Sequence, residues 1–341
     1  MSLTTIDSVG GSAARSITGG LTKTGVDVRA KLVEALLIAA LGGSLLILAV
    51  LIVDLIRRSW SVWTGRGAEF LTSGLNTTSA DIAGVWSGLK GTLVLAGLVI
   101  VIAFPLGIAC AVYLEEYAGK SGFARLTRVN VRNLAGVPSV VYGLLGLGIF
   151  VKVLDSVGSG GQDVQGHGFV PFHWVGNLMD WIGGNNGRTV FAGGLALSAL
   201  VLPIVVITTS EALRAVPRGI REGALGVGAT QWETIRSHVL PAATPGILTG
   251  TVLSIARAMG EAAPILIVGA TTGTLLTGNQ NFVEQLSGPW TGLPVVIFSY
   301  ARQPGSVWSS LTAAAALVLL VLVLVLNGFA IWMRNRYERK W

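Results

Sequence analysis

Two charged residues, Arg257 and Glu261, lie within a long apolar run, residues 246–270, and Arg257 is about half-way along it. They are four residues apart, so a continuous helix would place them on one face. A charged side chain within a membrane costs about 2.5–3.5 kcal/mol on insertion scales and usually has a function. Arginine can hold an oxyanion through two parallel hydrogen bonds, and a nearby carboxylate would weaken that binding. The pair therefore predicts an anion pathway; a structural ion pair that locks two helices is the alternative.

Small residues form a ridge along the same run. Gly246, Gly250, Ser254 and Ala258 recur at every fourth position and would share one helix face. Small side chains let membrane helices approach closely. We expect the ridge to be a helix–helix interface, and the charged pair near it to face an interface or a watery path.

A second candidate site is the polar segment 210–241, between two apolar runs. Pro217 can open a helix that runs to Leu225, because proline is tolerated in the first turn of a helix. Gly226 and Gly228 are expected to end this helix.

The rest of that segment predicts a second short helix. Thr230 and Glu233 have the spacing of a capping box, and the helix is expected to end before Pro241. Two short helices joined at glycines predict a compact knob on which another protein docks. The alternative is an ordinary solvated loop.

Other chemistry has little support. The one cysteine excludes a disulfide within the chain and a cysteine metal cluster. Residues 119–121 (Gly-Lys-Ser) resemble the end of a phosphate-binding loop, but Leu114 stands where that motif needs glycine. His167 and His173 have no acidic motif at metal-ligand spacing. We expect no catalytic residue, metal or cofactor on this chain.

The composition indicates which elements position these residues. The chain has 341 residues, of which 52% are hydrophobic and 12% are charged. Soluble domains carry about 25% charged residues, so too little polar surface remains to coat a soluble globule. Disorder, collagen and nucleic-acid binding are disfavoured, although the net charge of +7 would suit nucleic acid. An all-α polytopic protein surrounded by membrane lipids is predicted.

Six apolar runs are long enough to cross a membrane, where unpaired backbone groups require helices. They are residues 35–53, 91–114, 134–151, 189–208, 246–270 and 311–333. Residues 32–333 would form the transmembrane domain. Residues 1–31 are expected to be a disordered tail because they are polar and rich in Gly, Ser and Thr, and residues 334–341 a short second tail.

Basic residues predict the orientation. Most of the 24 Lys and Arg lie in the two tails and in the loops after the second and fourth runs. The positive-inside rule places these segments, and both termini, in the cytoplasm. Arg57 and Arg58 are a local exception beside the first run.

Residues 222–241 resemble the EAA loop of binding-protein-dependent ABC importer permeases. The matching residues are Glu222, Gly223, Ala224, Gly228, Leu240 and Pro241, all at the family's spacing. Gly223 replaces an alanine of the family pattern, and His238 replaces an aliphatic residue. The resemblance implies a permease of the type I ABC importer fold, with residues 210–241 as a cytoplasmic two-helix loop that couples to an ATPase.

Three further motifs resemble phosphate importer permeases: residues 113–118 (Tyr-Leu-Glu-Glu-Tyr-Ala), 241–250, and 257–264 (Arg-Ala-Met-Gly-Glu-Ala-Ala-Pro). The last motif is more similar to the A-type subunit, the PstA family, than to its C-type partner. The resemblance covers about residues 85–330. It implies a subunit of an ATP-driven phosphate importer in the bacterial inner membrane. The implied partners are a C-type permease, two copies of an ATPase that binds the ATP and Mg²⁺, and an extracytoplasmic phosphate-binding protein.

Two rival functions remain open. One is a permease for another oxyanion, such as molybdate or sulfate, against which the Arg257–Glu261 pair argues only moderately. A secondary transporter would use Glu261 as a proton relay and would work without an ATPase.

Overall fold

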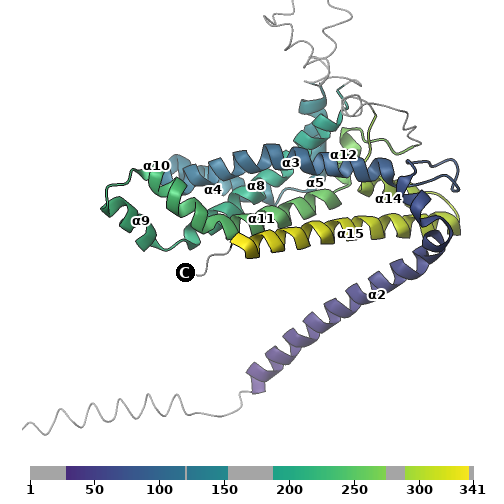
Figure 1. Cartoon of the computed structure of the whole chain (residues 1–341), viewed down its shortest axis with the longest axis horizontal. Coiled ribbons are helices and arrows are strands. Elements are labelled where there is room, and N and C mark those ends of the chain that lie inside the picture. Colours follow the sequence, from purple (N-terminus) through teal and green to yellow (C-terminus); the bar gives the residue numbers. More distant parts are fainter. Residues whose placement is uncertain (1–27, 120, 153–186, 274–288, 338–341) are drawn as a thin grey trace, which may run out of the picture. The chain divides into compact units, whose positions relative to one another are not determined.

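The computed structural model describes residues 28–119, 121–152, 187–273 and 289–337, and all regular elements in these ranges are helical. Figure 1 shows α2 (Val28–Thr72), α3 (Trp86–Val112), α4 (Gly122–Ala135), α5 (Ser139–Leu145), α8 (Val190–Ala215), α9 (Arg218–Gly226), α10 (Gln231–Thr234), α11 (Leu240–Gly260), α12 (Ala263–Val268), α14 (Leu293–Ala301) and α15 (Ser306–Tyr337). π-Helical segments lie at Tyr113–Tyr117, Gly146–Val151 and Ile235–Val239. The chain divides into two compact units, Met1–Asp54 and Leu55–Trp341.

Five helices of the described part are long and apolar enough to cross a membrane. They are Ala30–Thr72, Trp86–Tyr117, Val190–Ala215, Gln231–Gly260 and Ser306–Arg336. A sixth span results if Gly122–Ala135 and Ser139–Val151, which are bent by 105° from one another, count as one. The predicted all-α polytopic fold is confirmed.

Two predicted runs are wrong as continuous helices, and a proline explains each break. The run 134–151 is interrupted because Pro138 disfavours helical conformation in the residue before it. The run 246–270 breaks after Gly260, and Glu261 is extended with φ −82° and ψ 110°. Pro264 lies four residues after Gly260, and a helix through it would bring its ring against the carbonyl of Gly260.

The helix ends also differ from the predicted boundaries. The first helix begins at Val28, inside the predicted tail 1–31, and extends to Thr72 with a kink at Arg66 (φ −151°, ψ 38°). The last helix continues to Tyr337, past residue 334, where the predicted second tail begins. Residues 1–27 and 338–341, where the remaining tail predictions fall, lie outside the described residues.

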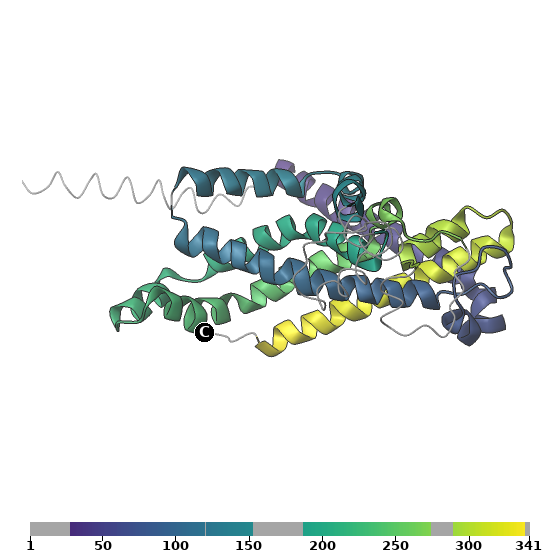
Figure 2. The same ribbon diagram turned by 90° about the horizontal axis from the view of Figure 1, so that it is seen from above.

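In the second unit, α8 packs against both α3 and α11, and α11 in turn packs against α15. Figure 2 shows that the axes of α3, α8 and α11 lie along the same general direction. In the apolar stretch of α8, 67% of the residues are buried, which is the highest share among the candidate spans. This core positions the ends of α3, α8 and α11, where the candidate sites lie.

Candidate functional site

The first short helix of the segment 210–241 ends at a glycine that is needed for its backbone conformation. Gly228 has φ +89°, in the left-handed region that favours glycine. Its N–H donates to the carbonyl of Leu225 at 3.0 Å, and the N–H of Ala229 donates to that of Ala224 at 3.1 Å. This pair of hydrogen bonds is the Schellman motif. Gly226 is still helical, so its predicted role as a helix breaker is wrong.

The predicted capping box is present at the start of α10. Glu233 donates its N–H to Thr230 Oγ1 at 3.3 Å and accepts the N–H of Thr230 at Oε2, 2.8 Å away. The prediction that this helix ends before Pro241 is wrong, because one helix continues from Gln231 to Gly260. Pro241 lies in the first turn of α11, and the π-helical segment just before it widens the helix where proline removes a hydrogen bond.

In the segment 210–241, called the coupling segment below, the residues after α8 pack with one side against the end of that helix. Ala224, Ile235 and Val239 are buried in a cluster that includes Leu213 and Val216. Among the matching motif residues, Glu222, Gly223, Gly228 and Pro241 are exposed and Leu240 is half-buried. The motif is therefore divided between an inner face that anchors it and an outer face that is free in this chain.

The outer face carries large apolar side chains. Leu225 is 51% exposed, Val227 86% and Trp232 55%. Large exposed apolar side chains on short helices at the end of a helix bundle are typical of a protein–protein contact. The arrangement fits a docking surface better than an ordinary solvated loop.

The two departures from the family pattern fit the structure. No atom lies within 4 Å of a Cβ built on Gly223, so the alanine of the family would also fit. His238 is exposed, so its imidazole is not forced into the apolar cluster.

The small-residue ridge of α11 lies against α8. A Cβ on Gly246 would be 2.8 Å from Ala212 Cβ, and one on Gly250 would be 2.4 Å from Thr208 Cβ. Ser254 and Ala258, further along the ridge, are buried. The structure therefore places Gly246 and Gly250 at a close contact with α8 and buries Gly250, Ser254 and Ala258.

Arg257 and Glu261 form an ion pair, with Arg257 Nε 3.6 Å from Glu261 Oε1. Their side chains are 57% and 20% exposed. Arg257 belongs to the last turn of α11 and Glu261 follows its end, so the predicted place half-way along an unbroken run is wrong. Arg257 precedes the ridge residue Ala258, so it projects about 100° around the helix from the α8 contact. The cation is therefore on an open face of the chain.

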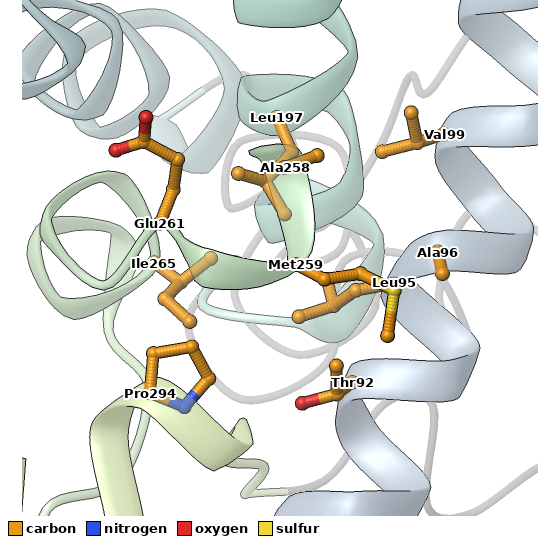
Figure 3. Close-up of a pocket in the computed structure, with 10 residues that line it drawn as sticks. All are labelled: Thr92, Leu95, Ala96, Val99, Leu197, Ala258, Met259, Glu261, Ile265 and Pro294. Carbon is orange, nitrogen blue, oxygen red and sulfur yellow. The ribbon is translucent and has the colours of Figure 1, made fainter. Parts of the chain in front are cut away.

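A narrow cleft lies beside Glu261, between α3, α8, α11, α12 and α14 (Figure 3). Its lining residues are Thr92, Leu95, Ala96, Val99, Leu197, Ala258, Met259, Glu261, Ile265 and Pro294. Figure 3 shows the Glu261 carboxylate pointing away from Ile265 and Pro294. Because the lining contains no Lys or Arg, this cleft by itself would hold an anion poorly.

The structure describes no group of three or more His, Cys, Asp and Glu side chains that could hold a metal. His167 and His173, considered above, lie outside the described residues.

Two acidic residues of the motif 113–118 form ion pairs that were not predicted from the sequence. Glu115 pairs with Arg214 and Glu116 pairs with Arg221, each at 2.8 Å. The sequence does indicate that salt bridges form here, because two adjacent acidic residues end one apolar run and arginines follow another. Which arginine pairs with which acid is decided by the fold.

Helices that cross a membrane, together with a capped two-helix loop at one end of the bundle, define a permease of the type I ABC importer class. Residues 103–339 match the family model "Binding-protein-dependent transport system inner membrane component", and the chain belongs to this family.

Curated relatives and a solved structure refine this assignment. The chain is 31% identical over 289 residues to "Phosphate transport system permease protein PstA" of Haemophilus influenzae, covering 82% of this chain and 87% of the relative. Its identity to the PstA protein of Mycobacterium leprae is 36% over 257 residues, covering 75% and 72%. The predicted resemblance to the PstA family is confirmed. A bacterial alginate ABC transporter solved with an alginate-bound periplasmic protein shares the fold, with TM-score 0.58, 21% identity, and 90% and 95% of the two chains covered.

The chain is thus a multi-pass inner-membrane permease subunit and not an enzyme. A permease of this class works with an ATPase and a substrate-binding protein.

Proposed function

We propose that this protein is the transmembrane permease subunit of an ATP-driven importer of inorganic phosphate. The observation that carries the proposal is the identity of 31–36% to PstA permeases over most of the chain. The chain would form the translocation pathway together with a second, C-type permease. Phosphate would arrive on an extracytoplasmic phosphate-binding protein.

The part of the segment 210–241 that follows α8, residues 216–241, is the docking surface for one of two copies of the cytoplasmic ATPase, which bind the ATP and Mg²⁺. The exposed Leu225, Val227 and Trp232 support this role, because they would be buried on docking. Both chain termini lie in the cytoplasm on this proposal, as the distribution of basic residues favours.

Arg257 lines the phosphate path at the interface with the second permease. Its side chain is 57% exposed near the end of a membrane helix, and a charge facing lipid would be costly. A polar path beside a partner subunit removes that cost, and Arg257 then provides a cation that can bind phosphate. Glu261, 3.6 Å away, lowers the net charge of the site so that phosphate can leave.

The test is labelled phosphate uptake by the reconstituted complex, normalised to assembled complex. Arg257→Gln is expected to reduce uptake by about tenfold or more, since charge-assisted hydrogen bonds are lost. Arg257→Lys keeps the charge without the forked geometry and should retain part of the uptake. Arg336→Gln, which removes an exposed arginine at the end of α15, is the matched control and should leave uptake unchanged.

Full uptake by Arg257→Gln would overturn the path and leave the helix-locking role. The reversed pair, Arg257→Glu with Glu261→Arg, separates these roles further, because it should restore a lock but not an anion path. Competition by excess molybdate or sulfate tests the other oxyanions. Uptake without the ATPase, on a proton gradient alone, would identify a secondary transporter.

A further inference from the structure

The π-helical turn Tyr113–Tyr117 follows α3 and carries two adjacent carboxylates, Glu115 and Glu116. Their side chains are each only 11% exposed. A carboxylate withdrawn from water needs cations or hydrogen-bond donors. Different helices supply these donors to the two residues, so the turn joins several elements at one place.

Glu116 is held by the coupling segment. Arg221 of α9 donates from Nε and Nη2 to Glu116 Oε1, at 3.2 and 2.8 Å. The same guanidinium donates to the carbonyls of Leu213 and Val216 at the end of α8, at 2.8 and 2.9 Å. Gln231 of α10 donates to the backbone carbonyl of Glu116 at 2.6 Å. Both short helices of the segment therefore bind the same residue at the end of α3.

Glu115 is held without α9 or α10. Arg214 of α8 donates from Nε and Nη2 to its two carboxylate oxygens, both at 2.8 Å. Arg128 of α4 lies 3.6 Å from Glu115 Oε1. The same turn thus contains two arginine–carboxylate ion pairs, each made through Nε and Nη2 of the arginine, and only the one at Glu116 involves α9.

The apolar contacts of α9 are few. It has nine residues, of which Ala224 is buried and Ile220 is partly buried against the same cluster. The Arg221 side chain is only 23% exposed, so its ion pair is less screened than a surface pair and adds to these contacts. At its other end α3 supplies Thr92, Leu95, Ala96 and Val99 to the cleft beside Glu261.

We propose that Glu116 and Arg221 are positioning residues that make α9 and α3 move as one body. A displacement imposed on the coupling segment by the ATPase then reaches the cleft beside Glu261 through α3. This inference rests on the proposed docking role of residues 216–241. Separating α9 from α3 would break charge-assisted hydrogen bonds and leave a half-buried arginine and a shielded carboxylate unpaired, which is costly.

The first experiment measures phosphate imported per ATP hydrolysed by the reconstituted complex. Arg221→Gln is expected to retain the ATPase and its hydrolysis while this ratio falls by about tenfold, the factor for loss of one charge-assisted hydrogen bond. Arg221→Lys should give an intermediate ratio and guards against a glutamine variant that fails to assemble. Arg214→Gln, which breaks the other ion pair, should keep the wild-type ratio.

The second experiment measures motion without reference to substrate. Spin labels at Gly219→Cys on α9 and Val101→Cys on α3, in a Cys110→Ala chain, should keep a constant distance through the ATP cycle. In the Arg221→Gln variant this distance should change when ATP binds. Gly219 and Val101 are both exposed, so the labels disturb no packing within this chain.

The proposal is overturned if Arg221→Gln keeps the wild-type ratio, or if Arg221→Gln and Arg214→Gln lower the ratio equally. A label distance that changes in the wild-type complex also overturns it. Absence of phosphate uptake by the wild-type complex refutes the proposed function instead, and the label distance still decides the role of the pair.

Discussion

Two glycines of the coupling segment offer a matched test of how it is built. Gly228 has φ +89°, whereas Gly223 is inside α9. No atom lies within 4 Å of a Cβ added at either position. An alanine therefore clashes with nothing at either site, and only its backbone preference differs.

The two substitutions should have effects of opposite sign. Gly228→Ala forces a side chain into the left-handed region, at a cost of about 1–2 kcal/mol. Gly223→Ala replaces glycine by the best helix former and should stabilise α9 by up to about 1 kcal/mol. A cost of 1–2 kcal/mol corresponds to a factor of about 5–30 in the opening equilibrium of the segment.

Hydrogen exchange at residues 228 and 229 measures that equilibrium, because their N–H groups make the two hydrogen bonds that end α9. Gly228→Ala should speed this exchange by the factor above and reduce ATPase co-purification and phosphate uptake. Gly223→Ala should slow exchange and leave both functions intact. Gly228→Asn should be milder than alanine, since asparagine tolerates the left-handed region.

Unchanged exchange in Gly228→Ala would refute the argument that a left-handed glycine ends α9. Faster exchange with full ATPase retention and uptake would instead show that the shape of this turn is not needed for coupling.

Two further predictions concern packing and topology. Gly250→Ala places a Cβ 2.4 Å from that of Thr208, so it should separate α11 from α8 and lower the complex's thermal stability, whereas Gly97→Ala in α3, with no atom within 4 Å, should not. Wild-type melting behaviour in Gly250→Ala would contradict the close contact. Reporter fusions after residue 162 should indicate the outer side and a fusion after Arg218 the cytoplasm; a cytoplasmic signal at residue 162 would refute the predicted orientation.

Local features of this protein follow from its sequence alone. Apolar length predicts which segments can cross the membrane, because the free energy of transfer depends on composition. The capping box at Thr230 and Glu233 also follows from sequence, because it needs only residues three apart. The ridge from Gly246 to Ala258 also follows from sequence, since every fourth residue of a helix shares a face. The helix breaks at Pro138 and Pro264 are local features too, although a prediction from apolar length alone does not show them.

Only the tertiary structure decides which distant residues meet. Glu116 and Arg221 are 105 residues apart, and neither helix periodicity nor charge pattern selects Arg221 over the other arginines near that end. The exposure of Arg257 is likewise a property of packing: the ridge turns Ala258 toward α8, and the adjacent arginine consequently projects from an open face. Spacing along one helix determines which side chains share a face, whereas the packing of neighbouring helices determines what that face meets.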